Sequence, residues 1–271
     1  MCTLAVYRGV SLRWPLVVVA NRDEFLGRAS APPERWPGEE AGIVAGRDLV
    51  AGGTWLGCRL DGSGRIVGVL NRRPAMDRPA SGPGERSRGL LCMESLQAPS
   101  IGAALEGLDG DEPARYGGFN LFLADLREGL VVDNGRGLRR VPLDTGLSVL
   151  TNLDVNDPRC PRLAGATRRF EAQRSMLAAG ADVGDLVPAL AGVLSSHDDG
   201  SLARTETASG ATILPAEAGA VPFSRICVHV GDYGTRSSSM IFVAADGSVR
   251  YFHADGAPCS APFREVEIRP S

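Results

Sequence analysis

Two short apolar runs at the start of the chain predict the element around which the other candidate residues gather. The first covers residues 2–8 and the second residues 15–20, and both are rich in β-branched side chains. Glycine and serine lie in the polar break between them, so the two runs predict an antiparallel hairpin. The second run ends in Asn21-Arg22-Asp23-Glu24. The hairpin would therefore bring charged side chains back to the thiol of Cys2.

Further along the chain, short β-branched runs predict strands, and apolar residues three or four apart predict helices. Asp61-Gly62 separates two such runs, and this dipeptide favours the tight turn of a hairpin. The predicted strands cover residues 54–60, 65–70, 119–125, 129–133, 148–152, 223–230, 239–244, 249–253 and 263–268. The predicted helices cover residues 86–97, 100–108, 158–179 and 183–195, with irregular segments at 25–40, 74–85 and 197–219.

Strands at both ends of the chain and helices in its middle indicate an α+β protein. Of the 271 residues, 44% are hydrophobic and 23% are charged, which is enough apolar material for a large core. We expect a single domain over residues 1–271, in which the central helices cover a sheet made from both chain ends.

Charge and hydropathy argue against two classes of partner. The formal net charge is -3, so the chain has no general attraction to nucleic acid or to anionic membranes. The longest apolar runs, such as residues 16–20, are far too short to span a bilayer. The first residues lack the basic-then-apolar layout of a signal peptide. We therefore expect no membrane insertion and a cytoplasmic location.

The choice of reactive residues narrows the chemistry. All 29 basic side chains are arginine, so Schiff-base catalysis, pyridoxal phosphate anchoring and a P-loop are excluded. The six cysteines are scattered, without a Cys-x-x-Cys pair, which favours reduced thiols. The three histidines, at 197, 229 and 253, have no metal-like spacing and do not lie near cysteine pairs in the sequence. We expect neither a zinc site nor a histidine-based triad, and no cofactor.

Cys2 is the candidate nucleophile. A cysteine at an arbitrary position is more often a buried packing residue. At position two, however, removal of Met1 would give one residue both a thiol and a free α-amine that titrates near ~8. The amine can then take the thiol proton without a histidine partner.

Polar side chains at other predicted strand ends could complete such a site. Asn71 and Asn152 either satisfy local turns or donate to an oxyanion. Asp23 caps a turn, pairs with Arg22 or holds the α-amine in position. The arginines near these ends are either solvated surface charges or anion-binding groups. They are Arg22, Arg72, Arg73 and Arg236.

Eight motifs in the chain resemble those of the NRDE family, also called the transport and Golgi organisation family. They are Met1-Cys2-Thr3-Leu4, Ala20-Asn21-Arg22-Asp23-Glu24-Phe25, Ala45-Gly46-Arg47-Asp48, Gly52-Gly53-Thr54-Trp55-Leu56-Gly57, Leu70-Asn71-Arg72-Arg73, Ser87-Arg88-Gly89, Leu150-Thr151-Asn152-Leu153 and Tyr233-Gly234-Thr235-Arg236. This family is similar to cysteine N-terminal-nucleophile hydrolases of the choloylglycine hydrolase and penicillin acylase type. The resemblance implies a four-layer αββα sandwich with mainly antiparallel sheets.

The same resemblance implies roles for individual residues. Cys2 matches the nucleophile and Asp23 the carboxylate after the second strand. Asn152 matches the oxyanion donor and Asn71 a second donor. The hydrolases carry an arginine three residues before the aspartate, where this chain has Ala20. Their C-terminal catalytic arginine corresponds to either Arg225 or Arg236.

Two functions remain open from the sequence. The first is hydrolysis or transfer of an acyl group from a small amide or thioester by Cys2. The second is binding and trafficking of haem, acyl-CoA or a lipid, which the family resemblance also implies. In either case Asn21 and the arginine side chains would contact an acyl or anionic ligand. A third alternative is an acylase-like fold that has kept no activity.

Overall fold

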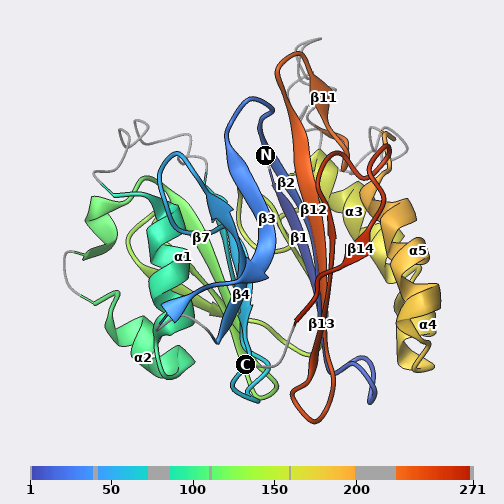
Figure 1. The fold of residues 1–271 in the computed structure, drawn as a ribbon, viewed down its shortest axis with the longest axis horizontal. Coiled ribbons are helices and arrows are strands. Elements are labelled where there is room, and N and C mark those ends of the chain that lie inside the picture. Colours follow the sequence, from blue (N-terminus) through green and yellow to red (C-terminus); the bar gives the residue numbers. More distant parts are fainter. Residues whose placement is uncertain are drawn as a thin grey trace, which may run out of the picture.

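Two seven-stranded sheets lie face to face, and helices cover the outer face of each (Figure 1). The computed structural model describes residues 2–38, 42–72, 86–109, 112–158, 160–198 and 224–268. The layers follow the order αββα, as the family resemblance implies. Among these described residues, no helix is long and apolar enough to cross a membrane.

The first sheet joins both ends of the chain. At its centre, β2 (Leu16–Phe25) pairs antiparallel with β1 (Thr3–Arg8) and β12 (Tyr233–Val243). Its outer strands are β10 (Gly146–Leu150), β11 (His229–Val230), β13 (Val249–Ala254) and β14 (Arg264–Glu265). The helices over this sheet are α3 (Pro161–Glu171), α4 (Arg174–Ala178) and α5 (Val183–Leu194). The expected sheet from both chain ends, covered by central helices, is confirmed.

The second sheet keeps its strands in chain order. They are β3 (Ser30–Arg35), β4 (Ile43–Asp48), β5 (Leu56–Arg59), β6 (Ile66–Asn71), β7 (Phe119–Ala124), β8 (Gly129–Asp133) and β9 (Arg139–Pro142). On its outer face lie α1 (Arg88–Gln97) and α2 (Ile101–Glu106), and the short 3₁₀ helix η2 (Glu112–Arg115) follows in the chain. Ser87 and Ser100 cap α1 and α2 by accepting backbone N–H bonds.

The central strand β2 explains its own uninterrupted apolar sequence. Leu16 and Val18 face the core between the two sheets, whereas Val17 and Val19 face the core beneath α3 and α5. Because both faces of β2 are buried, every position favours an apolar side chain. A third core lies between the second sheet and α1 and α2. The strand thus runs through the interior and delivers its polar end, residues 21–25, to the edge of the sheets.

The prediction of an irregular segment at residues 25–40 is wrong, because β3 lies within it. Proline cannot donate to a β-ladder, and the prolines in this segment therefore suggested a loop. β3 is an edge strand, and its register with β4 shifts between Ala31 and Glu34, where Pro32 and Pro33 lie. Edge position and an irregular register are the settings in which a strand tolerates proline.

Other boundaries also differ from the prediction. The helical stretch at 158–179 divides near residue 173 into α3 and α4, and β12 begins at Tyr233 rather than at residue 239. The strand expected at 223–230 is reduced to β11 in the described part of the chain. β4 and β9 were not predicted. The loop expected at 74–85 and most of the segment 197–219 lie outside the described residues.

Candidate active site

A cleft of about 710 Å³ lies at the polar ends of β2 and β6, beside the start of β1. Cys2 lines it, together with residues from the segments before α1 and after β4. Five arginines and three carboxylates also line it: Arg22, Arg28, Arg72, Arg86, Arg88, Asp23, Glu24 and Asp48. The cleft therefore offers a thiol in surroundings dominated by guanidinium groups.

The strand registers place Cys2 between two of the other candidates. Leu4 pairs with Leu150 on β10 and with Ala20 on β2. Continuing both ladders by two residues puts Cys2 opposite Asn152 on one side and Arg22 on the other. The thiol is half-buried, and its Sγ lies 3.7 Å from the backbone oxygen of Asp23.

Burial raises the pKa of the Cys2 thiol, the charge of Asp23 raises it further, and Arg22 acts in the opposite direction. The thiol is therefore protonated at rest and needs a base before it can attack an electrophile. In this setting, an adjacent α-amine would supply that base.

Asp23 is held rigidly by groups from two other elements. Its carboxylate accepts a hydrogen bond from Thr235 on β12 at 2.8 Å and pairs with Arg162 on α3 at 2.7 Å. The side chains of Asp23 and Arg162 are 0% and 1% exposed. Tyr233 donates its hydroxyl to the backbone oxygen of Asp23 at 3.2 Å. The carboxylate is thus a fixed charge beside the first residues of β1.

Sequence reasoning missed Arg162. It lies in the first turn of α3, where the helix dipole disfavours a cation. That local conflict was a usable signal, because a cation placed against the dipole needs a compensating anion. Arg162 also contacts the hydroxyl of Thr3, at 3.4 Å, so it links α3 to both β1 and β2.

Asn152 is buried at the end of β10, and its Nδ2 donates to the backbone oxygen of Asn71. Within the described residues, its Oδ1 is buried without a hydrogen-bond partner. Asn71 is exposed and lines the cleft. The two asparagines predicted from separate strand ends therefore meet in space, because the side chain of one contacts the backbone of the other.

Arg72 helps to hold the segment around Asn152 in place. It pairs with Asp133 at 3.3 Å and with Asp154, and it donates to Asn120 at 2.9 Å. Asn120 in turn donates to the backbone oxygens of Thr151 and Leu153, on either side of Asn152. Arg72 lines the cleft, but these partners give it the role of fixing the Asn152 segment.

Arg22 lies against an aromatic ring in the cleft and, within the described part of the chain, makes only long ion pairs. Its guanidinium lies 4.1 Å from the centroid of the Trp55 ring, and its carboxylate partners are only loosely placed, with Asp48 at 3.6 Å and Glu24 at 4.0 Å. Its side chain is 7% exposed, and Nη1 is buried without a hydrogen-bond partner among the described residues. Burial lowers the pKa of Arg22 from its ordinary value.

Arg88, within the Ser-Arg-Gly motif, also lines the cleft and was not singled out from the sequence. It donates to the backbone oxygen of Gly118 at 2.9 Å. Burial lowers the pKa of Arg88, while the neighbouring Cys2 and Glu24 oppose that change. Arg88 and Arg22 therefore both interact electrostatically with Cys2 and Glu24.

The remaining sequence candidates lie elsewhere. Asn21 is buried, and its side chain is used in bonds to Leu194, Ile226 and Ser238, which tie β2 to α5 and β12. Arg225 and Arg236 are both described in the structure, and neither lines the cleft. Arg236 pairs with Asp255 at 2.8 Å. Arg73 lies outside the described residues.

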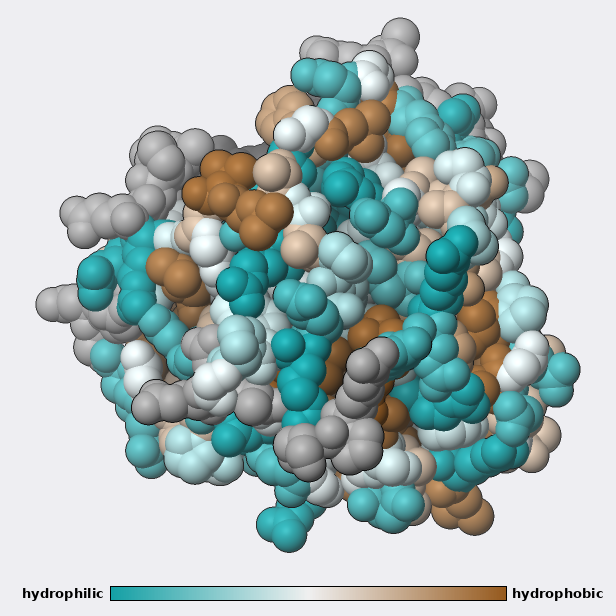
Figure 2. All heavy atoms as spheres, in the orientation of Figure 1, coloured by the Kyte–Doolittle hydropathy of each residue, from teal (hydrophilic) through white to brown (hydrophobic). Residues whose placement is uncertain are grey.

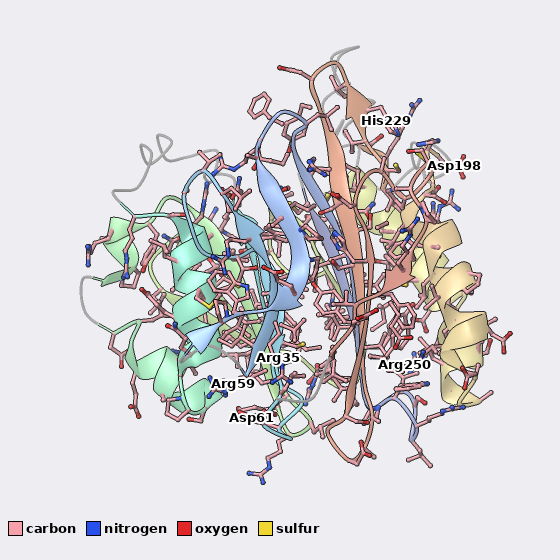
Figure 3. The ribbon with its side chains drawn as sticks, in the orientation of Figure 1. Arg35, Arg59, Asp61, Asp198, His229 and Arg250 are labelled. Atoms are coloured by element: carbon pink, nitrogen blue, oxygen red, sulfur yellow. The ribbon has the colours of Figure 1, made fainter. Side chains whose placement is uncertain are left out.

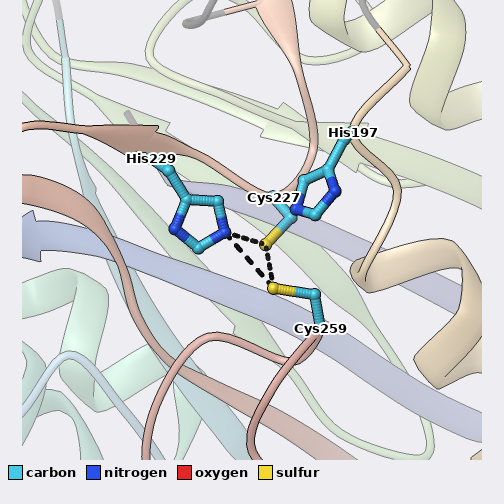
Figure 4. A group of neighbouring side chains, drawn as sticks. All are labelled: His197, Cys227, His229 and Cys259. Carbon is cyan, nitrogen blue, oxygen red and sulfur yellow. Dashed lines mark hydrogen bonds between the residues drawn. The ribbon is translucent and has the colours of Figure 1, made fainter.

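Two of the three histidines lie near cysteines in space. In the sequence the histidines have no metal-like spacing and do not lie near cysteine pairs, which is why we expected no zinc site. In the structure, however, His197 and His229 gather with Cys227 and Cys259 (Figure 4). The fold brings together residues from three chain segments, which spacing along the sequence could not show.

The fold defines a class of protein, the four-layer αββα sandwiches of the N-terminal-nucleophile hydrolase type. A solved structure, the Caenorhabditis elegans orthologue of N-acylethanolamine-hydrolyzing acid amidase, matches with a TM-score of 0.51. The match covers 92% of this chain and 94% of that one, at 13% identity, so it shows the shared fold.

The chain belongs to the family described as Transport and Golgi organisation 2, whose sequence model matches residues 1–255. The homologue from Bos taurus is 32% identical over 249 residues, covering 87% of this chain and 84% of the relative. The homologue from Homo sapiens is 30% identical over 251 residues, with the same coverage. These matches confirm the family resemblance seen in the motifs.

Proposed function

We propose that this protein hydrolyses or transfers an acyl group from a small amide or thioester, with Cys2 as nucleophile after removal of Met1. The observation that carries the proposal is the position of the thiol. It lines a large cleft beside a rigidly held carboxylate, Asp23, and by strand register it lies opposite a buried amide, Asn152.

The proposed chemistry follows from these groups. The free α-amine of Cys2 takes the thiol proton, and the thiolate attacks the acyl carbonyl carbon. The side-chain amide of Asn152 donates to the resulting oxyanion, as Asn71 does from the cleft side. The intermediate collapses to a thioester as the α-ammonium returns its proton to the leaving amine or thiol. Water, or an acceptor nucleophile, then releases the acyl group.

The other lining groups indicate an acyl ligand that combines apolar and anionic parts. Phe25, Leu26, Leu49 and Val50, at the ends of β2 and β4, are exposed apolar residues, and Phe25 lines the cleft. Figure 2 shows apolar surface interrupting the polar face near the upper end of the sheets. Guanidinium groups inside the cleft suit a carboxylate or phosphate. A fatty acyl conjugate meets both conditions.

A panel of fluorogenic acyl amides and thioesters tests this function. Cys2→Ala should lower turnover of any accepted substrate at least about a thousandfold, and Asn152→Ala about a hundredfold. Cys92→Ala removes a thiol on α1 that does not line the cleft, and it should retain turnover. Equal turnover by the wild-type protein and Cys2→Ala would exclude the mechanism.

The Arg22 guanidinium favours a second candidate, the binding of an anionic ligand such as haem or acyl-CoA without cleavage. Arg22 lines the cleft, and among the described residues its buried Nη1 has no hydrogen-bond partner, so a propionate or phosphate oxygen would give this group an acceptor. On this proposal, Arg22→Gln should weaken haem binding, followed by absorbance titration, about tenfold or more. Arg13→Gln, at an exposed ion pair that does not line the cleft, is the control. Absence of saturable binding at micromolar protein would rule this function out.

A further inference from the structure

A cluster of two thiols and two imidazoles lies near β11, apart from the proposed catalytic groups. Figure 3 places His229 at the opposite end of the molecule from Arg59 and Asp61. His197 follows α5, Cys227 lies just before β11, His229 is the first residue of β11, and Cys259 lies between β13 and β14. Each residue offers one ligand atom, and the four atoms lie within 4.8 Å of one another. In Figure 4 the four side chains point toward a common centre.

The separations match those around a tetrahedral metal ion. Zn–S bonds of about 2.3 Å and Zn–N bonds of about 2.0–2.1 Å require roughly 3.8 Å between two sulfurs and roughly 3.5 Å between sulfur and nitrogen. The two sulfurs, of Cys227 and Cys259, are 3.7 Å apart. The Nε2 of His229 lies 3.5 Å from the first sulfur and 3.2 Å from the second. Three vertices of a tetrahedron are therefore already in place.

His197 completes the set. Its ring centroid is 5.2 Å from that of His229, and its ligand atom is within 4.8 Å of the other three. Because His197 is exposed, rotation of its side chain can close the remaining distance. Two thiolates and two imidazoles form a donor set that favours Zn²⁺ over the harder Mg²⁺ and Ca²⁺.

We propose that His197, Cys227, His229 and Cys259 bind one Zn²⁺ in a closed, four-ligand structural site. Four protein ligands leave no open position for water or substrate, so the ion would fasten chain segments together rather than react. The segments it would join are the end of α5, the start of β11 and the loop before β14.

This site lies one strand away from the carboxylate in the cleft. Val228 lies between the two ligands near β11, and its backbone N–H donates to the Thr235 hydroxyl at 2.9 Å. The backbone N–H of Thr235 donates in return to the Val228 backbone oxygen at 2.9 Å. The same Thr235 hydroxyl donates to Asp23 at 2.8 Å. Zinc would thus hold the segment that orients Thr235 against Asp23.

The experiment measures zinc in the full-length protein, purified under reducing conditions, stripped with a chelator and reloaded with Zn²⁺. Elemental analysis should find about one zinc per chain in the wild type. Cys227→Ser and Cys259→Ser should lose most of it, whereas Cys2→Ser, which also removes one thiol, should retain it. Reloading the stripped wild type with Co²⁺ should give the strong visible absorption of tetrahedral cobalt–thiolate coordination, which reports on the ligands without any substitution.

Several outcomes would overturn the proposal. One is a reduced, folded wild type that takes up no more zinc than Cys227→Ser. Another is weak cobalt absorption, which would indicate binding elsewhere by oxygen ligands. A third is a disulfide between Cys227 and Cys259 in the purified protein, combined with a failure to bind zinc after that disulfide is reduced. Mass spectrometry would detect the disulfide as a joined peptide that is two daltons lighter than its two parts. Circular dichroism of each variant separates loss of ligands from loss of fold.

Discussion

The buried Arg162–Asp23 pair gives a sharp test of what holds the site together. Its N–O distance is 2.7 Å, and both side chains are essentially unexposed. The chain offers a matched pair on its surface, Arg13–Asp182, with a separation of 2.6 Å and side-chain exposures of 49% and 53%. Because the two N–O distances are nearly equal, any difference in how much the two pairs stabilise the fold comes from their exposure to solvent.

The expected magnitudes diverge accordingly. Two unit charges 4 Å apart attract by about 1 kcal/mol in water and about 4 kcal/mol at an effective dielectric constant of 20. Removing one partner of a buried pair leaves an uncompensated charge and costs about 3–5 kcal/mol. Arg162→Gln should therefore lower Tm by roughly 6–20 °C for a chain of this size. Arg13→Gln should leave Tm nearly unchanged.

Thermal and urea unfolding of both variants, with a double-mutant cycle through Asp23→Asn, measures the coupling. Arg162→Lys adds a control that keeps the positive charge but loses the forked geometry of guanidinium, and it should recover part of the stability. Similar Tm values for Arg162→Gln and Arg13→Gln would refute the assignment of Arg162 as the counter-charge that fixes Asp23.

Two further predictions concern pH and backbone geometry. Burial lowers the pKa of His253 to about 4, below its ordinary 6.5, so the fold favours the neutral ring. The unfolded chain therefore takes up a proton on this ring at a higher pH than the folded protein does. The free energy of unfolding should be at its full value above about pH 6.5 and should fall by up to about 3 kcal/mol as the pH is lowered to about 4. His253→Gln should flatten urea-unfolding stability over that window, and an unchanged slope would contradict this. Gly52 and Gly53 have nearly equal φ values, +72° and +73°, but different surroundings. A Cβ added at Gly53 would lie 2.2 Å from the backbone of Gly89, whereas a Cβ added at Gly52 would lie 3.6 Å from the side chain of Leu90. Gly53→Ala should thus cost clearly more than the roughly 1 kcal/mol of φ strain expected for Gly52→Ala, and equal losses would count against the packing of this cleft wall.

Local pattern was sufficient to predict most of the first sheet and its helices. β1 and β2 are dense in β-branched residues, and turn residues separate them, so they could be predicted without tertiary information. The edge strand β3 could not, because its prolines are tolerated only through its place at the sheet edge. Likewise, β12 begins with Tyr233-Gly234-Thr235, a turn-like sequence that becomes a strand because β2 pairs with it.

The candidate site divides in the same way. Residues at strand ends, such as Asn71 and Asn152, could be grouped because a sheet edge collects them. Asn21 resembled them in sequence, yet its side chain faces α5 and not the cleft. Arg162 and the metal-type cluster depend on how helices and loops dock onto the sheets. Apart from the unfavourable place of Arg162 in the first turn of α3, contacts of that kind leave little trace in local sequence.

Peptide mapping after treatment with an electrophilic acyl probe tests the central role of Cys2 most directly. The protein should first be exposed to a chelator, so that Cys259, the exposed thiol, is available for non-specific reaction. We expect the probe to label Cys2 ahead of the other five cysteines, on a peptide whose N-terminus is Cys2 itself. Labelling of Cys259 first, or an active protein that retains Met1, would contradict the account.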